Sequence, residues 1–242
     1  MREQHVAPFF FLSMTNALIS YLERFISKKR KELFDSVLTY RTRYITVVLE
    51  DIFQSQNASA VLRTCDCFGI QDIHIIEDRN EFRINPDVTL GSDKWLTLKK
   101  YKSCKNNTLK AINTLKKKGY RIVATTPHQD NTELKDFNLS AGKAALFFGT
   151  ELQGLSSDIL QNADEYLKIP MFGFTESFNI SVSIAIILNE LVTKLHTSTI
   201  EWQLPEKDKM EVKQAWLKKS IKKSDLIEKE FYQNHIQNQK NK

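Results

Sequence analysis

Cysteine is scarce in this sequence: the 242 residues contain three, Cys65, Cys67 and Cys104. An odd number of cysteines with no C-x-x-C spacing argues against both a disulfide framework and a zinc site. We therefore expect a protein of the reducing cytoplasm that needs no metal.

Long hydrophobic runs are also missing. Residues 4–22 carry no formal charge, but Pro8, Ser13 and Asn16 interrupt their apolar character. No stretch approaches the roughly 20 apolar residues of a membrane span, and Glu3 offsets Arg2 where a signal peptide would be positive. We interpret this segment as an apolar arm or the start of a helix, and we expect no membrane partner.

The common nucleotide fingerprints are absent as well. Neither G-x-G-x-x-G nor the Gly-Lys-Ser/Thr of a P-loop occurs among the 7 glycines. This counts against a dinucleotide-dependent oxidoreductase or a nucleoside triphosphatase. What remains is an ordinary globular composition, with 41% hydrophobic residues and a net charge of +6, which favours a polyanionic partner without establishing one.

Predicted strands and helices alternate through the middle of the chain. β-Branched and apolar runs predict strands at 44–49, 73–76, 121–125, 144–148 and 166–169, and helical spacing predicts helices at 58–68, 107–118, 156–162 and from Ile180. This alternation indicates an α/β fold with a mostly parallel sheet. In such sheets ligands bind at the carboxyl ends of strands, so the loops after Leu49, Thr125, Phe148 and Ile169 should converge.

Both ends of the chain are basic and helical in pattern. We expect one helix over 16–34, with a basic cluster at 28–31, and another over 206–234. The predicted division is an extension at 1–40, a central domain at 41–200 and a second basic extension at 201–242. The basic clusters are either solvated helix faces or phosphate contacts.

Three segments carry candidate chemistry. In the first, Asn57 stands where a helix N-cap is expected, and Arg63 follows inside an otherwise apolar helix. A charge in that position is either part of a structural salt bridge or faces an anionic ligand.

The second segment, residues 148–155, runs from a strand into a turn with one carboxylate, Glu151. Gly149 would let a ligand approach the backbone, although a tight turn is the simpler interpretation. In the third, residues 169–191, a loop with Ser177 and Asn179 leads into an apolar helix. That helix start is either a cap on a core helix or a site for a small polar ligand.

Taken together, these segments resemble the SpoU (TrmH-type) branch of the SPOUT RNA methyltransferases. The resemblance runs through residues 57–70, 146–155 and 169–183, in the family's order, and extends to the Gly-Ser-x-x-Trp segment at 91–95. Phe178 and Glu176 depart from the family, which usually has Leu and then Gln or Ser at these positions.

The resemblance implies one α/β domain whose C-terminal part forms a deep trefoil knot, assembled as a homodimer. It implies S-adenosyl-L-methionine as the cofactor, with Thr125, Gly149, Ile169 and Phe178 as contacts, mostly through their backbone.

The implied reaction is methyl transfer to a ribose 2′-oxygen of RNA. The residues implied for catalysis are Arg63, Asn57, Glu151, Ser177 and Asn179. A guanidinium hardly ever deprotonates, so our hypothesis is that Arg63 clamps the adjacent phosphate and stabilises the developing alkoxide. The other four would position Arg63, the cofactor and the ribose.

Short helical arms around a bare core resemble the tRNA guanosine-18 branch of the family. We therefore expect a tRNA partner, with RNA contacts at Arg41, Arg43, Lys218 and Lys219. The alternatives are ribosomal RNA as the substrate, or a non-catalytic RNA-binding protein on the same scaffold.

Overall fold

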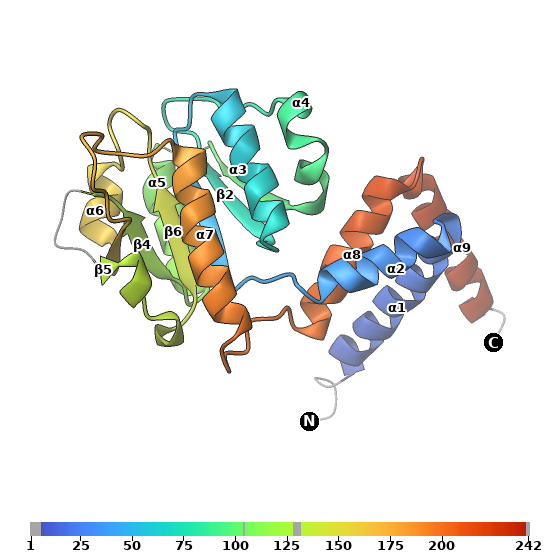
Figure 1. Cartoon of the computed structure of the whole chain (residues 1–242). Coiled ribbons are helices and arrows are strands. Elements are labelled where there is room, and N and C mark those ends of the chain that lie inside the picture. Colours follow the sequence, from blue (N-terminus) through green and yellow to red (C-terminus); the bar gives the residue numbers. More distant parts are fainter. Residues whose placement is uncertain (1–5, 104, 128–131, 241–242) are drawn as a thin grey trace. The chain divides into compact units, whose positions relative to one another are not determined.

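A computed structural model describes residues 6–103, 105–127 and 132–240 (Figure 1). The chain divides into two compact units. One is the α/β unit, Thr42–Gln203, and the other is a helical unit made of Met1–Arg41 and Leu204–Lys242. The two terminal extensions thus belong to one unit. Cys104 lies outside the described residues.

The α/β unit is built on a seven-stranded sheet in the order β3-β2-β1-β6-β4-β7-β5. Every pair of neighbouring strands is parallel, which confirms the predicted sheet type. The strands are β1 (Ile45–Glu50), β2 (Asp72–Ile76), β3 (Thr97–Tyr101), β4 (Arg121–Thr125), β5 (Thr132–Glu133), β6 (Ala144–Phe148) and β7 (Glu165–Lys168).

Helices cover both faces of this sheet (Figure 1). Helices α3 and α7 pack on one face, and α5 and α6 pack on the other. The helices of the unit are α3 (Ser55–Cys67), α4 (Pro86–Thr89), α5 (Asn107–Lys117), α6 (Ser157–Asn162) and α7 (Ile180–His196), with short 3₁₀ turns at Ser92–Trp95, Leu134–Asp136 and Leu139–Ala141.

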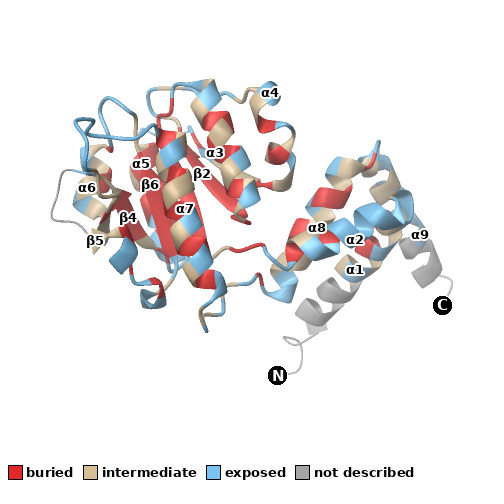
Figure 2. Ribbon diagram, in the orientation of Figure 1, coloured by how far each residue is buried: buried red, intermediate tan, exposed pale blue. Residues whose placement is uncertain are grey.

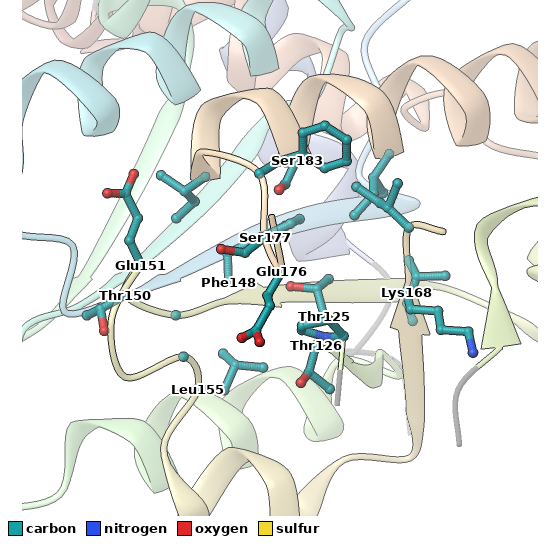
Figure 3. Close-up of a pocket in the computed structure, with 18 of the residues that line it drawn as sticks. Thr125, Thr126, Phe148, Thr150, Glu151, Leu155, Lys168, Glu176, Ser177 and Ser183 are labelled. Atoms are coloured by element: carbon teal, nitrogen blue, oxygen red, sulfur yellow. The ribbon is translucent and has the colours of Figure 1, made fainter. Parts of the chain in front are cut away.

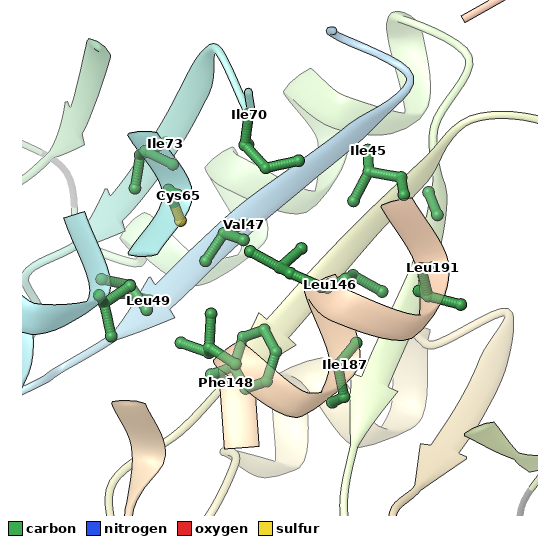
Figure 4. Close-up of a cluster of buried hydrophobic side chains, with 14 of the residues drawn as sticks. Ile45, Val47, Leu49, Cys65, Ile70, Ile73, Leu146, Phe148, Ile187 and Leu191 are labelled. Atoms are coloured by element: carbon green, nitrogen blue, oxygen red, sulfur yellow. The ribbon is translucent and has the colours of Figure 1, made fainter. Parts of the chain in front are cut away.

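Burial on both faces explains why the central strands are almost uniformly apolar (Figure 2). Within β1, Val47 and Leu49 face α3 and α7, whereas Val48 faces α5. In β6, Phe148 and Phe147 divide between the faces in the same way. Figure 4 shows the face covered by α3 and α7, where strand residues contact Ile187 and Leu191 of α7.

The prediction missed two strands and one helix of this unit: β3, β5 and α4. The edge strand β3 consists of half-exposed residues with two lysines, so it lacks the apolar run that marked the other strands. In α4, Asn85 is the cap and Pro86 is the first helical residue. Gly69 follows the end of α3 with φ 72°, the left-handed conformation usual for a glycine after a helix end.

The helical unit contains α1 (Val6–Leu22), a 3₁₀ turn (Glu23–Phe25), α2 (Lys28–Leu38), α8 (Glu206–Ser220) and α9 (Ser224–Lys240). The prediction of one helix over 16–34 is wrong, because Ser27 ends the first segment and caps α2 by accepting a hydrogen bond from the Arg30 N–H. The single helix over 206–234 is also wrong. It breaks where Ile221 turns to an extended conformation and Lys223 takes φ 58°.

An aromatic contact and an ion cluster hold these helices together. The rings of Phe34 in α2 and Trp216 in α8 lie 5.4 Å apart, and the guanidinium of Arg41 lies 5.2 Å from the Trp216 ring. Lys213 of α8 pairs with Glu23 at 2.6 Å and with Asp35 at 2.5 Å. These contacts join segments almost 180 residues apart in sequence, as in the 178-residue separation of Lys213 and Asp35.

A buried histidine, His74, lies in the sheet. His74 in β2 is 1% exposed, its ring stacks on that of Tyr101, and its Nδ1 lies 2.7 Å from the Tyr101 hydroxyl. Burial, reinforced by the nearby charge of Lys99, lowers the pKa of His74 to about 3. The imidazole is therefore neutral in the folded protein at neutral pH.

This buried histidine makes the fold sensitive to acid. Between pH 6.5 and about 3 the unfolded chain binds a proton at His74 that the folded chain does not, so stability falls as the pH falls. The contribution is roughly 1.4 kcal/mol per pH unit. We expect His74→Gln to flatten the pH dependence of the unfolding free energy, measured by urea denaturation from pH 7 to 4. His196→Gln, at an exposed site on α7, is the control, and equal slopes in both variants would contradict the assignment.

Candidate functional site

The loops that follow four neighbouring strands meet at one edge of the sheet, as predicted. Loops after β4, β6 and β7 line a cavity of about 290 Å³. The loop after β1 lines a second cavity of about 390 Å³, which shares the 150–153 segment with the first. This edge is therefore the candidate site.

A closed turn after β6 forms the wall between the cavities. The backbones of Thr150 and Gly154 exchange two hydrogen bonds, of 3.1 and 2.9 Å. The Thr150 hydroxyl also accepts from the Gln153 N–H at 3.1 Å. A Cβ at position 149 would lie 2.0 Å from the Gly154 carbonyl oxygen, so Gly149 is needed to close this turn. The structure thus gives the tight turn, left open by the sequence, a definite steric basis.

Three polar side chains from three segments join at this turn. Oε1 of Glu151 accepts hydrogen bonds from Nδ2 of Asn57 at 2.7 Å and Nδ2 of Asn179 at 2.9 Å. Asn179 also donates to Oδ1 of Asn57 at 3.0 Å. We call Asn57, Glu151 and Asn179 the amide–carboxylate cluster. It ties α3, the turn after β6 and α7 together at the site.

The two asparagines play different local roles. Asn179 is the N-cap of α7, and its Oδ1 accepts from the Ser181 N–H at 2.9 Å, as expected for this helix start. Asn57 is not an N-cap, because α3 begins two residues earlier at Ser55, after Gln54. Its side chain is free of capping and instead reaches Gln54 and Glu151.

Two buried carboxylates at the end of β1 support the loops of the site. Glu50, 3% exposed, accepts hydrogen bonds from the Thr108 hydroxyl at 2.8 Å and from the N–H and hydroxyl of Ser156 at 2.8 and 2.6 Å. It thereby fixes the N-terminal ends of α5 and α6 against the sheet.

The next residue, Asp51, is 2% exposed and has the left-handed φ of 53°, which a residue with a side chain adopts only when its surroundings hold it. Its Oδ1 accepts three consecutive backbone N–H groups, from Asp78, Arg79 and Asn80, at 2.8, 2.8 and 3.2 Å. Neither Glu50 nor Asp51 was predicted as part of the site, although two acidic residues at the end of a buried strand are an unusual signal.

The first cavity combines apolar walls with carboxylates (Figure 3). Leu155, Leu167 and Ile187 line it, and Glu176 and Glu151 bring negative charge. Lys168 is the one cation among its described lining residues, and in Figure 3 its side chain points away from Glu176. Such a lining suits a ligand with a flat apolar part and a positive charge, whereas a phosphate group would meet repulsion.

The sequence-predicted residues divide into two groups. Six of them line the first cavity: Thr125, Gly149, Glu151, Ile169, Ser177 and Phe178. The hydroxyl of Thr125 donates to the Phe147 carbonyl at 2.7 Å. Arg63 is exposed on α3 and lines neither of the two cavities, so the structure does not bring it to the amide–carboxylate cluster.

The four residues predicted to contact RNA are in different environments. Arg41 is 2% exposed beneath Trp216, so its side chain is not offered at the surface and the predicted RNA contact does not fit this structure. Arg43 pairs with Asp72 at 3.1 Å and Lys218 with Glu228 at 2.6 Å, both partly buried. Lys219 is exposed.

Within the described ranges, no group of three or more His, Cys, Asp or Glu side chains is placed to hold a metal ion. No helix there combines the length and the apolar character needed to cross a membrane.

The fold and site define an α/β protein with a cavity suited to a small organic cation, at the point where the loops after β4, β6 and β7 meet. The model of the SpoU rRNA Methylase family matches residues 44–189, and the chain belongs to this family.

Among its relatives, a tRNA (guanosine(18)-2′-O)-methyltransferase from Borreliella burgdorferi is 46% identical over 210 residues, covering 87% of this chain and 94% of the relative. The solved structure of the A. aeolicus TrmH/SpoU tRNA modifying enzyme superposes with a TM-score of 0.71 at 27% identity, covering 81% of this chain and 98% of that one. The methyltransferase AviRb from Streptomyces viridochromogenes, solved in complex with AdoMet, shares the fold with a TM-score of 0.56 at 21% identity, covering 67% of this chain and 65% of that one.

The turn after β6 gives a direct test of the site's construction. Gly149→Ala forces the new Cβ into a backbone carbonyl, so we expect the free energy of unfolding to fall by about 1–3 kcal/mol. Gly173→Ala is the control, because no atom lies within 4 Å of its Cβ position, and we expect a change within about 0.5 kcal/mol. Urea denaturation measures both, and equal midpoints for the two variants would refute this role of Gly149.

Proposed function

We propose that this protein transfers a methyl group from S-adenosylmethionine to the ribose 2′-oxygen of guanosine-18 in tRNA. The observation that carries the proposal is the amide–carboxylate cluster at the mouth of a cavity suited to a nucleoside cation. The family membership and the named function of the 46% identical relative support the substrate.

The lining of the first cavity fits the cofactor. When bound, S-adenosylmethionine supplies a methyl group activated by a positively charged sulfur. The backbone at Thr125, Gly149, Ile169 and Phe178 would hold its adenosine, between the apolar side chains of the cavity. The carboxylate of Glu176, in place of the neutral residue usual in the family, adds negative charge that favours a cation.

The amide–carboxylate cluster would orient the acceptor ribose. Asn57 and Asn179 both donate to Oε1 of Glu151, and no described residue donates to Oε2. We assign Oε2 to accept the hydrogen bond of the 2′-hydroxyl and to take its proton as the oxygen bonds to the methyl group, while the sulfonium leaves as a neutral thioether. Ser177 lines the first cavity together with Glu151 and would also position the ribose.

Arg63 would act on the phosphate next to this ribose. Its guanidinium is exposed on the helix that also carries Asn57, and it lines neither cavity of the free chain. Bound RNA, or a second subunit, would have to bring the ribose phosphate and Arg63 together. The planar guanidinium would then bind two phosphate oxygens and stabilise the negative charge that develops on the 2′-oxygen.

We also propose the homodimer and the trefoil knot that family resemblance implies. Phe172 and Phe174, in the loop between β7 and α7, are 97% and 109% exposed, and apolar side chains so exposed favour an interface. In the sheet, β6 lies between β1 and β4, and β7 lies between β4 and β5. Late strands inserted between early ones support a threaded chain. The cytoplasm remains the predicted location.

Methyl transfer from labelled S-adenosylmethionine tests the reaction. We expect label in a tRNA transcript with guanosine-18 and none in the same tRNA carrying 2′-deoxyguanosine at that position, because the acceptor oxygen is then absent. Mapping of the modified ribose identifies the nucleotide. Label in ribosomal RNA alone would overturn the tRNA assignment, and RNA binding without transfer would indicate a non-catalytic protein.

The role of Arg63 has its own test. Arg63→Lys keeps the charge but loses the planar pair of donors, so we expect kcat/KM for tRNA to fall at least about tenfold. Arg83→Lys, at an exposed site that lines neither cavity, is the matched control and should retain the wild-type value. Near-normal turnover by Arg63→Lys would rule out the two-point phosphate clamp.

A further inference from the structure

The second cavity lies across the 150–153 segment from the cofactor cavity, and both cavities include Glu151. The residues that line this second cavity differ in chemistry from those that line the cofactor cavity. Of the described residues around it, Arg79 alone is positively charged and Phe53 alone is aromatic. It therefore offers one anion-binding group and one flat apolar surface.

Arg79 is held in place before any ligand arrives. Its Nε donates to Oδ2 of Asp51 at 3.3 Å, and its Nη1 donates to Oε1 of Gln153 at 2.5 Å. Its backbone N–H is bound by the same Asp51 carboxylate. A guanidinium has five N–H donors, so these two side-chain contacts leave three for a ligand.

The charge of Arg79 is also accessible. Its side chain is 57% exposed, although Asp51 beside it is only 3% exposed. A surface arginine that is fixed at two nitrogens loses less conformational entropy on binding an anion than a freely rotating one. The structure thus presents an oriented cation at the cavity, on the segment that Asp51 fixes to the end of β1.

Phe53 supplies the flat surface. Its side chain is 77% exposed, and it follows β1 in the loop that leads to α3 and Asn57. Exposed aromatic rings next to a cation are the usual combination for single nucleotides, with the base stacked on the ring and the phosphate on the cation.

We propose that this second cavity binds the RNA nucleotide that is methylated, with its base stacked on Phe53 and with Arg79 on the flanking phosphate that Arg63 does not hold. This inference rests on the proposed function and assigns the acceptor side of that site. The ribose then lies at Glu151, which lines both cavities, so the 2′-oxygen faces the cofactor cavity. Phe53 and Arg79 become specificity-determining residues outside the three sequence motifs.

Two variants and one control test this assignment. Phe53→Leu keeps an apolar side chain but removes the stacking surface, and Arg79→Gln removes the charge but leaves the backbone contacts of Asp51. Arg83→Gln is the control, since Arg83 is 76% exposed, pairs with Glu81 and lines neither cavity. Circular dichroism melting curves establish that each variant is folded.

Three quantities are measured for each full-length variant: the tRNA dissociation constant at several salt concentrations, kcat/KM for tRNA, and the affinity for S-adenosylmethionine. We expect Phe53→Leu and Arg79→Gln each to lower kcat/KM about tenfold, with cofactor affinity unchanged. Arg79→Gln should also reduce the slope of log binding constant against log salt by about 1, whereas Phe53→Leu should not.

The outcomes separate this inference from the proposed reaction. If the wild type methylates tRNA and both variants match the control, the nucleotide assignment is wrong and the reaction stands. Loss of cofactor affinity in both variants would assign the cavity to the cofactor instead. If the wild type transfers no methyl group but both variants bind tRNA more weakly, the nucleotide site holds and the proposed reaction fails.

Discussion

The site depends on two consecutive buried carboxylates at the end of the central strand β1. Glu50 binds the beginnings of α5 and α6 through Thr108 and Ser156, and Asp51 binds three backbone N–H groups of the loop after β2. Buried carboxylates are costly unless fully hydrogen-bonded, and these two accept seven hydrogen bonds between them from the described part of the chain. Three loops are thereby fixed to one strand end, which gives the cavities defined walls.

The sheet could be predicted because its central strands are buried on both faces. β1 and β6 are apolar runs in the sequence, and the polar residues around them mark where each strand begins and ends. Where burial is partial, the pattern fails: β3 is a half-exposed edge strand. The breaks in the helical unit were missed for a different reason. The helical spacing of apolar residues continues across Ser27 and Lys223. It therefore does not indicate the helix cap at Ser27 or the left-handed backbone at Lys223, which depend on tertiary packing.

The candidate site was predictable in its parts but not in its contacts. The motifs identified Glu151, Asn57 and Asn179, yet nothing in their spacing indicated that one carboxylate oxygen would accept from both asparagines. Asn57 was assigned as a cap because helix starts vary by one or two residues in sequence. Arg79 lies outside every motif. Its place depends on Asp51 and Gln153, which are 28 and 74 residues away, and only the fold unites them.

The turn from Thr150 to Gly154 gives the two cavities a common wall, and this constrains how donor and acceptor could meet. Glu151 extends from a turn whose closure depends on Gly149, and its orientation is fixed by amides from two other segments. A carboxylate on an unsupported loop would sample many positions, whereas in-line transfer requires the reacting atoms to be held within about 3–3.5 Å. The same turn supplies Gln153, which orients Arg79. This one turn therefore fixes Glu151 and, through Gln153, also Arg79, so we expect a change in it to disturb both cavities together.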